Sequence, residues 1–255
     1  MALIFGSMGE NAAIRYLTGL AGVTMAEYFR DEMKKEVLFF VDNVFRFAQA
    51  GNELSTLMNT IPSEDGYQPT LTSEMASFHE RLVSTQDGVI STIEAIYVPS
   101  DDLLDHGVQS VYAHLDSVVT LSRQVYQEGR MPAVDPLTST SASLNTQVVG
   151  EVHYQTAVTA QGMLKKAESL ERMVNLVGEA ELSAENQALY KRAKKLKNYL
   201  TQDFFVTSDQ AGRPGKFVPA AVAVADVAGI ISGKYDQVPE ERFLYIGSMG
   251  EISNG

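Results

Sequence analysis

The side chains best suited to chemistry in this 255-residue chain follow one short apolar run. Residues 37–41 are all apolar, and they are followed by a carboxylate (Asp42), an amide (Asn43) and, one helical turn later, a cation (Arg46). A Mg-nucleotide site needs such a strand end opposite its phosphate loop, where the carboxylate holds the metal ion and a neighbouring polar group orients water. Two simpler explanations stay open: an aspartate that serves a turn, and an i,i+4 ion pair worth a few tenths of a kcal/mol.

A second apolar strand is expected to end beside the first. Residues 88–99 read GVISTIEAIYVP and contain Tyr97, and the carboxylate pair Asp101-Asp102 follows. In open parallel sheets, ligands bind at the carboxyl ends of the strands. The pattern therefore predicts one site at that edge of the sheet, which contains Asp42, Asn43, Arg46, Tyr97 and Asp101.

Other kinds of catalytic and metal site find little support in the sequence. The nearest match to a G-x-x-x-x-G-K-[ST] phosphate loop is residues 210–217, with Gln210 at the first glycine position and Phe217 at the hydroxyl position, so we reject it. The four histidines lack metal-ligand spacing, no G-x-S-x-G motif occurs, and the absence of cysteine excludes disulfides and thiolate sites.

The elements that must position these residues alternate between strand and helix in the first part of the chain. Residues 2–5 predict a buried strand, Thr24 and Glu27 have capping-box spacing for a helix over 25–35, and a strand over 37–42 follows. This alternation indicates an α/β fold with a mostly parallel sheet and flanking helices.

The second part of the chain has helical periodicity throughout. A polar stretch, residues 137–145, precedes helices expected over 152–177, 184–200 and 219–235. We therefore predict two domains, 1–149 and 150–255, the second of them all-helical.

Composition limits the kind of partner this chain can have. The net charge is −12, nearly all of it in residues 1–149, which argues against a nucleic-acid binder. No apolar run approaches the roughly 18 residues of a membrane span, and the N-terminus lacks the layout of a signal peptide. We expect a cytoplasmic protein.

Eight stretches spread over nearly the whole chain form one recognisable set: AEYFRD (26–31), VLFFVDNVFRFAQAG (37–51), IPSEDGYQPTLTSEM (61–75), AIYVPSDDLLD (95–105), AHLDSVVTLSR (113–123), PAVDPLTSTS (132–141), VVGEVHY (148–154) and GKYDQVPEERF (233–243). Together they resemble one known family, the catalytic beta subunit of the rotary (F-type) ATP synthase. The resemblance implies a partial RecA-like P-loop NTPase core followed by an all-helical C-terminal domain. It matches the C-terminal half of that family, in which the phosphate loop and the catalytic glutamate lie further N-terminal.

The resemblance also implies roles for individual residues. Asp42 falls on the carboxylate at the Mg²⁺ ion, and Asn43 and Arg46 fall on positions that contact the transferring phosphate of ATP or ADP. Tyr97 and Asp101 line the same cleft, although Asp101 could equally serve structural contacts. Phe204 falls on an aromatic residue of the adenine pocket.

Three departures from the family pattern indicate a divergent homologue, similar to the synthase-like rotary ATPases of mycoplasmas. The adenine-stacking tyrosine is Met131 here, and a second pocket aromatic is Gln210. The acidic loop that contacts the rotor shaft is residues 180–186, AELSAEN, with two carboxylates left. These changes put tight adenine recognition and standard rotor contact in doubt.

We therefore expect part of a catalytic beta-type subunit that binds Mg-ATP at an interface with an alpha-type neighbour in a hexameric ring. Phosphoryl transfer to or from water would be coupled to rotation of a central shaft, and the membrane would be reached only through the complex. This chain alone should not turn over ATP. The alternatives are a non-catalytic ring member kept for assembly and, with only composition behind it, a free-standing metal-binding or helical adaptor.

Overall fold

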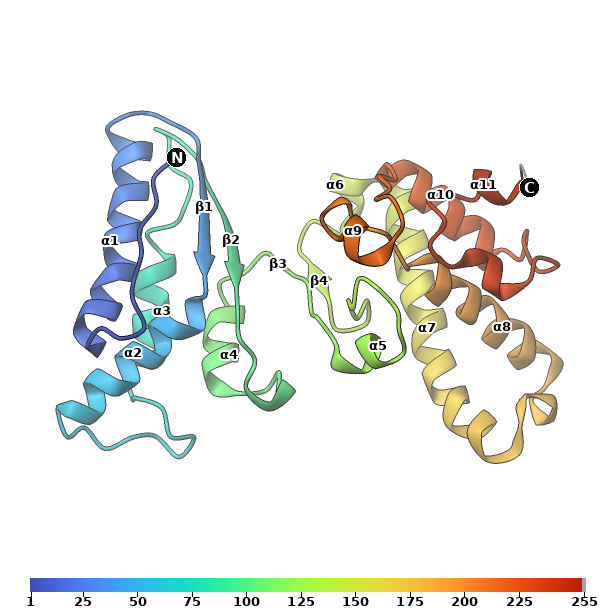
Figure 1. Cartoon of the computed structure of the whole chain (residues 1–255), viewed down its shortest axis with the longest axis horizontal. Coiled ribbons are helices and arrows are strands. Elements are labelled where there is room, and N and C mark those ends of the chain that lie inside the picture. Colours follow the sequence, from blue (N-terminus) through green and yellow to red (C-terminus); the bar gives the residue numbers. More distant parts are fainter. Residues whose placement is uncertain (254–255) are drawn as a thin grey trace. The chain divides into compact units, whose positions relative to one another are not determined.

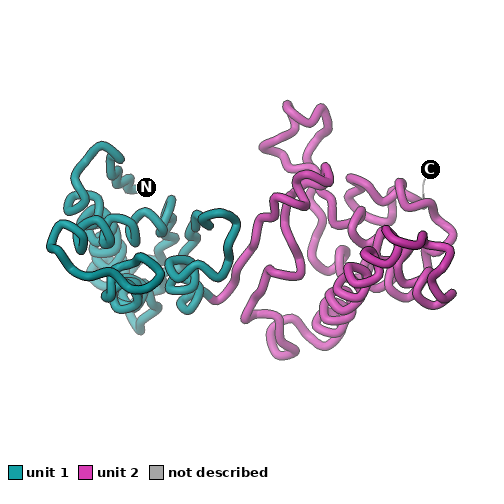
Figure 2. The backbone as a smooth tube through the Cα atoms, turned by 90° about the horizontal axis from the view of Figure 1, so that it is seen from below, with its two compact units in different colours: residues 1–115 teal, residues 116–255 magenta. Residues whose placement is uncertain are grey.

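The computed structural model describes residues 1–253, which form two compact units, residues 1–115 and 116–253 (Figure 2). The predicted domain boundary between residues 149 and 150 is a different division of the chain and stays a prediction. Each unit has a hydrophobic core of its own.

Unit 1 is a two-stranded parallel sheet with helices packed against one of its faces (Figure 1). Its elements in chain order are α1 (Ala12–Asp31), β1 (Val37–Asp42), α2 (Val44–Leu57), α3 (Leu71–His79), β2 (Ile90–Ala95), the short 3-10 helix η1 (Pro99–Asp101) and α4 (His106–Tyr112). The strands pair from Val37 opposite Ile90 to Asp42 opposite Ala95. Two of the three strands that the sequence predicted for unit 1 are thus present, and they are parallel.

Alternation along β1 separates a core face from an exposed face. Val37, Phe39 and Val41 pack against the core that α1, α2 and α3 build. The other face exposes three large apolar side chains, Leu38, Phe40 and Ile93. The strand is therefore half-buried, as a period of two residues requires.

Two local predictions for the N-terminal region are wrong. Residues 2–5 form no strand, because no neighbouring strand in the described chain pairs with their backbone groups, and their side chains are exposed. Helix α1 begins well before the expected position, where the Asn11 side chain accepts a hydrogen bond from the Ile14 amide. Thr24 does not cap a helix, because it lies inside α1 and its hydroxyl donates to the Leu20 carbonyl.

Unit 2 begins with small elements and continues as helices. Its elements are β3 (Ser117–Val118), α5 (Arg123–Gln127), β4 (Thr140–Ser141), α6 (Thr146–Val149), α7 (Glu151–Val177), η2 (Glu179–Glu181), α8 (Ala184–Tyr199), η3 (Phe205–Thr207), α9 (Ser208–Ala211), α10 (Ala220–Ile231), η4 (Glu240–Phe243) and α11 (Gly250–Ser253). The three long helices predicted from periodicity are confirmed as α7, α8 and α10.

The core of unit 2 lies among its three long helices. Leu164 and Leu170 from α7, Leu196 from α8 and Ile230 from α10 pack together, and Phe243 is fully buried beside them. The Lys195 ammonium is also buried, and it donates to the carbonyls of Tyr235 and Asp236 at 2.9 and 2.7 Å. The two carbonyls compensate the ammonium for its lost hydration.

The fold-class prediction is confirmed: a parallel sheet with flanking helices precedes a C-terminal helical domain. Among residues 1–253, no helix has both the length and the apolar character needed to cross a bilayer.

Candidate functional site

The strand end of β1 passes into helix α2 through a single residue. Asp42 closes the strand and is exposed, and the peptide bond that joins it to Asn43 is cis. Asn43 is the N-cap of α2, because its side-chain oxygen accepts a hydrogen bond from the Arg46 amide at 3.1 Å. The sequence forms this turn because an asparagine cap satisfies a free amide of the first helical turn. A carboxylate and the amino end of a 14-residue helix are thus adjacent.

Arg46 lies in the first turn of α2, and its guanidinium is exposed to solvent. Its guanidinium Nη1 donates to the Gln49 side-chain oxygen at 2.9 Å, and the residue is exposed. In the part of the chain that the structure describes, no ion pair joins Arg46 to Asp42. The simple i,i+4 ion pair is therefore not formed, and a positive charge lies at the positive end of a helix dipole, an arrangement that favours an anion.

Strand β2 brings Tyr97 to the same edge of the sheet. Because Ala95 pairs with Asp42, Tyr97 lies just beyond the end of β1, and its ring lies 5.7 Å from the Phe45 ring, centroid to centroid. Asp101 closes η1 with a positive φ of 58°. Of the predicted residues in unit 1, Asp42, Asn43, Arg46 and Tyr97 therefore share one edge, and Asp101 lies in the turn that follows.

Sequence reasoning missed two residues that hold this edge in place. The Tyr67 hydroxyl donates to the Asp105 carboxylate at 2.9 Å, and burial first, then this carboxylate, raises the pKa of the tyrosine. The Gln68 side chain is buried and donates to the Ala48 carbonyl on α2 at 3.2 Å. Their position in an irregular, polar segment gave no periodic signal.

A magnesium ion fits the donor set at this edge. Among the described residues, no group of three histidine, aspartate or glutamate side chains forms a complete metal site. Mg²⁺ does not require one, because it keeps several waters and is bound through one or two carboxylates together with substrate phosphates. The exposed carboxylate of Asp42 is the group that could hold it.

Unit 2 contains the other two predicted site residues, Met131 and Phe204. A backbone hydrogen bond joins the two segments in which they lie. The Gln202 amide donates to the Met131 carbonyl at 2.7 Å, two residues before Phe204. Both side chains are partly open to solvent, with Met131 40% and Phe204 45% exposed. Gln210, on the short helix α9, is also exposed.

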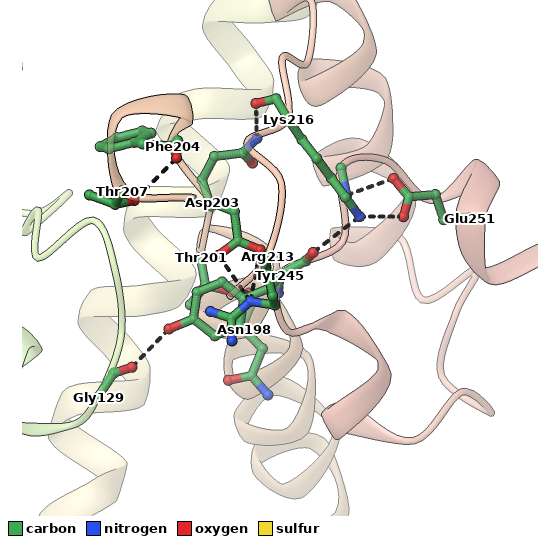
Figure 3. Close-up of polar contacts among 12 residues, drawn as sticks. Gly129, Asn198, Thr201, Asp203, Phe204, Thr207, Arg213, Lys216, Tyr245 and Glu251 are labelled. Atoms are coloured by element: carbon green, nitrogen blue, oxygen red, sulfur yellow. Dashed lines mark hydrogen bonds and ion pairs between the residues drawn. The ribbon is translucent and has the colours of Figure 1, made fainter. Parts of the chain in front are cut away.

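A polar network that the sequence did not predict lies next to Phe204 and reaches Gly129, two residues before Met131 (Figure 3). The Tyr245 hydroxyl donates to the Gly129 carbonyl at 2.9 Å, and the Tyr245 amide donates to the Thr201 hydroxyl at 2.9 Å. Arg213 lies over the Tyr245 ring, 4.1 Å from its centroid, and its Nε donates to the Asp203 carboxylate at 2.9 Å. Long sequence separations made this network invisible to a search for local motifs.

These features define a parallel-sheet unit with polar side chains at its strand ends, followed by a helical domain. Residues 1–141 match the family described as "ATP synthase alpha/beta family, nucleotide-binding domain", and residues 143–215 match "C-terminal domain of V and A type ATP synthase". The chain therefore belongs to the ATP synthase alpha/beta family.

One solved structure with the same fold is the ATP synthase subunit NeqB from Nanoarcheaum equitans. The two chains share 23% sequence identity and superpose with a TM-score of 0.74, over 89% of this chain and 55% of NeqB. This chain thus spans about half the length of that relative. The first match covers alpha and beta subunits together and the second covers V and A types, so the family is coarser than the F-type beta subunit expected above.

Proposed function

We propose that this chain is part of the catalytic beta-type subunit of a rotary ATPase and binds Mg-ATP at the strand edge of unit 1. The observation that carries the proposal is the turn between β1 and α2, where the exposed Asp42 carboxylate, the Asn43 cap and the uncompensated Arg46 cation occur together. Most of the surrounding charge is negative, so an anionic ligand needs a local cation and a metal ion.

Each residue at the turn has a distinct task in the proposed reaction. Asp42 would hold Mg²⁺, which supplies charge neutralisation at the phosphates when bound. The planar guanidinium of Arg46 donates to the oxygens of the transferring phosphoryl group, and these bonds strengthen as negative charge develops there. The Asn43 side-chain oxygen accepts the capping hydrogen bond from the Arg46 amide. Its side-chain NH₂ group could therefore donate to a phosphate oxygen or to a water molecule.

The reaction is transfer of the terminal phosphoryl group of ATP to water, or its reverse. A bond forms between phosphorus and the water oxygen while the bond to the ADP oxygen breaks, and one proton of the attacking water is released to the solvent. The chain contributes position and charge and forms no covalent intermediate. In the assembly we propose, alpha-type subunits complete a hexameric ring, residues 180–186 face a central shaft, and the ring is attached to the membrane through the complex at its cytoplasmic side.

The proposal is tested on the complex purified from its source cells through an affinity tag on this chain. We expect co-purifying subunits of the same family and Mg-dependent ATP hydrolysis. Asp42→Asn should lower this hydrolysis at least tenfold, because a neutral amide binds Mg²⁺ poorly. Asp87→Asn, at an exposed carboxylate paired with Lys34, is the matched control and should leave the rate unchanged.

A second candidate, a non-catalytic ring member, is favoured by methionine at the base-stacking position and by the exposed Gln210. This candidate predicts that the complex assembles normally. It also predicts that the Asp42→Asn variant and the parent complex hydrolyse ATP at the same rate.

A further inference from the structure

The imidazole of His79 connects the end of helix α3 to strand β2. Its Nε2 lies 3.0 Å from Oε2 of Glu94, and its Nδ1 lies 2.7 Å from the carbonyl oxygen of Met75. The side chains of His79 and Glu94 are 5% and 2% exposed, so bulk water does not compete for these contacts. Both ring nitrogens therefore face an acceptor in a buried part of unit 1.

These contacts require one proton more than a neutral imidazole and an ionised carboxylate supply. A neutral imidazole has one N–H and one lone pair. If its Nδ1 donates to Met75, the Nε2 lone pair faces the Glu94 carboxylate; if its Nε2 donates to Glu94, the Nδ1 lone pair faces the Met75 carbonyl. In either case two acceptors face each other without a proton, which costs free energy where water is excluded. The His79–Glu94 pair is therefore complete only when it holds this proton.

Glu94 has no second partner for its charge. Among residues 1–253, its other oxygen, Oε1, is buried and accepts no hydrogen bond. Val41, the residue opposite Glu94 on β1, is apolar. A buried carboxylate that loses its single partner must move toward water or take up a proton. Loss of the shared proton therefore acts directly on the contact between α3 and β2.

The other titratable groups around the pair do not replace this proton. His114 stacks on the His79 ring, with the centroids 4.8 Å apart and the planes at 9°, and burial first, then His79, lowers the pKa of His114. His114 is therefore neutral where His79 is protonated. Glu80 is exposed, and Arg81 donates two hydrogen bonds to Glu27 of α1.

We propose that His79 and Glu94 form a pH-sensitive switch between α3 and β2, closed while the pair holds its proton and opened reversibly when the proton leaves. Burial would lower the pKa of His79, but the hydrogen bond and charge of Glu94 raise it above 6.5. The contact is thus complete below pH 6.5 and is lost as pH rises through the raised pKa. Glu94 lies next to Ala95, which pairs with Asp42, and three residues before Tyr97. The switch therefore acts on a strand of the candidate site, and it does not depend on the proposed function.

The test is hydrogen exchange of the tagged protein, followed by mass spectrometry from about pH 6 to about pH 9, with labelling times scaled for the faster intrinsic exchange at alkaline pH. At the alkaline end we expect peptides from α3 and β2 to exchange about tenfold faster than the scaling predicts, because a charge-assisted hydrogen bond is lost. Peptides from α1 and α7 should follow the scaling. A return to the acid end should restore the protection of α3 and β2.

Glu94→Gln separates the shared proton from the contact itself. The glutamine amide can donate to Nε2 of a neutral imidazole, so α3 and β2 should stay protected over the whole pH range. Glu80→Gln, at the exposed carboxylate next to His79, is the matched control and should keep the pH response of the parent.

Three results would overturn the inference: α3 and β2 of the parent follow the scaling, Glu94→Gln responds as the parent does, or α1 loses protection together with them. Protection of α1 at the acid end shows whether Glu94→Gln is folded, and the response of the parent decides if it is not. The readout is protection and not hydrolysis, so a failure of this inference is distinguishable from a failure of the proposed function.

Discussion

The edge of the sheet in unit 1 and the Asp203–Arg213–Tyr245 network of unit 2 are built in opposite ways. In unit 1, Asp42 and Arg46 are exposed, and among residues 1–253 the Arg46 guanidinium bonds Gln49 and no carboxylate. In unit 2, Asp203 is buried and Tyr245 and Arg213 are linked through several bonds. The comparison teaches that Asp42 and Arg46 have no charged partner among the described residues, whereas Asp203, Arg213 and Tyr245 are already partners of one another.

Apolar burial differs between the same two regions. The helices of unit 2 close around Phe243 and Leu196, both fully buried, whereas the sheet of unit 1 leaves Phe40 and Ile93 more than half exposed. Unit 1 therefore gains stability from only one face of its sheet.

The largest effect is expected from substitutions at the turn between β1 and α2 in unit 1. Arg46→Lys in the tagged complex should lower ATP turnover about a hundredfold or more, because an ammonium cannot reproduce the bidentate contact with the transferring phosphate. Asn43→Ala should show a milder loss. The measurement is steady-state hydrolysis, with assembly checked by size-exclusion chromatography, and normal turnover of an assembled Arg46→Lys ring would favour the non-catalytic reading.

The next largest effect is a loss of stability, which should differ between a buried phenylalanine of unit 2 and an exposed one of unit 1. Phe243→Ala should destabilise unit 2 by about 3–5 kcal/mol through lost contacts and a cavity, whereas Phe40→Ala should change unit 1 by less than about 0.5 kcal/mol. Hydrogen exchange followed by mass spectrometry reports the two units separately. Similar losses of protection in both variants would contradict the contrast in core closure.

A smaller effect concerns the base. Met131→Tyr should raise kcat/KM for ATP relative to GTP, because an aromatic ring stacks on a base with on the order of 1–3 kcal/mol, of which a thioether recovers only a part. The ATP/GTP ratio is the quantity to measure, and Met173→Tyr on α7 is the control at another exposed methionine. An unchanged ratio would remove Met131 from the base pocket.

The smallest effect is a pH dependence restricted to unit 1. Burial alone would lower the pKa of His79, but the hydrogen bond and charge of Glu94, whose oxygen lies 3.0 Å from Nε2, and the Met75 carbonyl raise it above its ordinary value of 6.5. Burial first, then the neighbouring His79, lowers the pKa of His114, whose ring stacks 4.8 Å away.

The signs of these two shifts are opposite. Protonated His79 stabilises the folded state below pH 6.5, and this contribution is lost as pH rises through its raised pKa. Neutral His114 stabilises the folded state above pH 6.5, and this contribution is lost as pH falls through its lowered pKa. Glu94→Gln should bring the His79 titration back toward 6.5 in an NMR experiment and flatten the alkaline loss of stability. An unmoved His79 titration would contradict the assignment to Glu94.

Periodicity predicted the regular elements well, because a repeat of two or 3.6 residues reports one buried face. Strand Val37–Asp42 and helices α7, α8 and α10 lie where the pattern placed them. The beginning of α1 was missed because a helix can start at any suitable cap, and Asn11 served where Thr24 was expected.

The candidate site was predictable only where it follows strand ends. Asp42, Asn43, Arg46 and Tyr97 share an edge because the register of a parallel sheet aligns them. The partnership of Asp203, Arg213 and Tyr245, and the burial of Lys195 within a basic run, depend on tertiary contacts between distant segments. Local patterns carry no information on such pairs.

Helix α7 has a mechanical consequence that follows from its length and its first joint. Its 27 residues form a rod of about 40 Å, and the residue before it, Gly150, has a φ of 79°, which side-chain-bearing residues rarely adopt. The segment before Gly150 is also bonded to the helical body, because the Gly129 and Met131 carbonyls accept from Tyr245 and Gln202. The turn at Gly150 is therefore held on both sides, and a force applied at the Val177 end passes along the rod into residues 116–149 and is not absorbed at the turn.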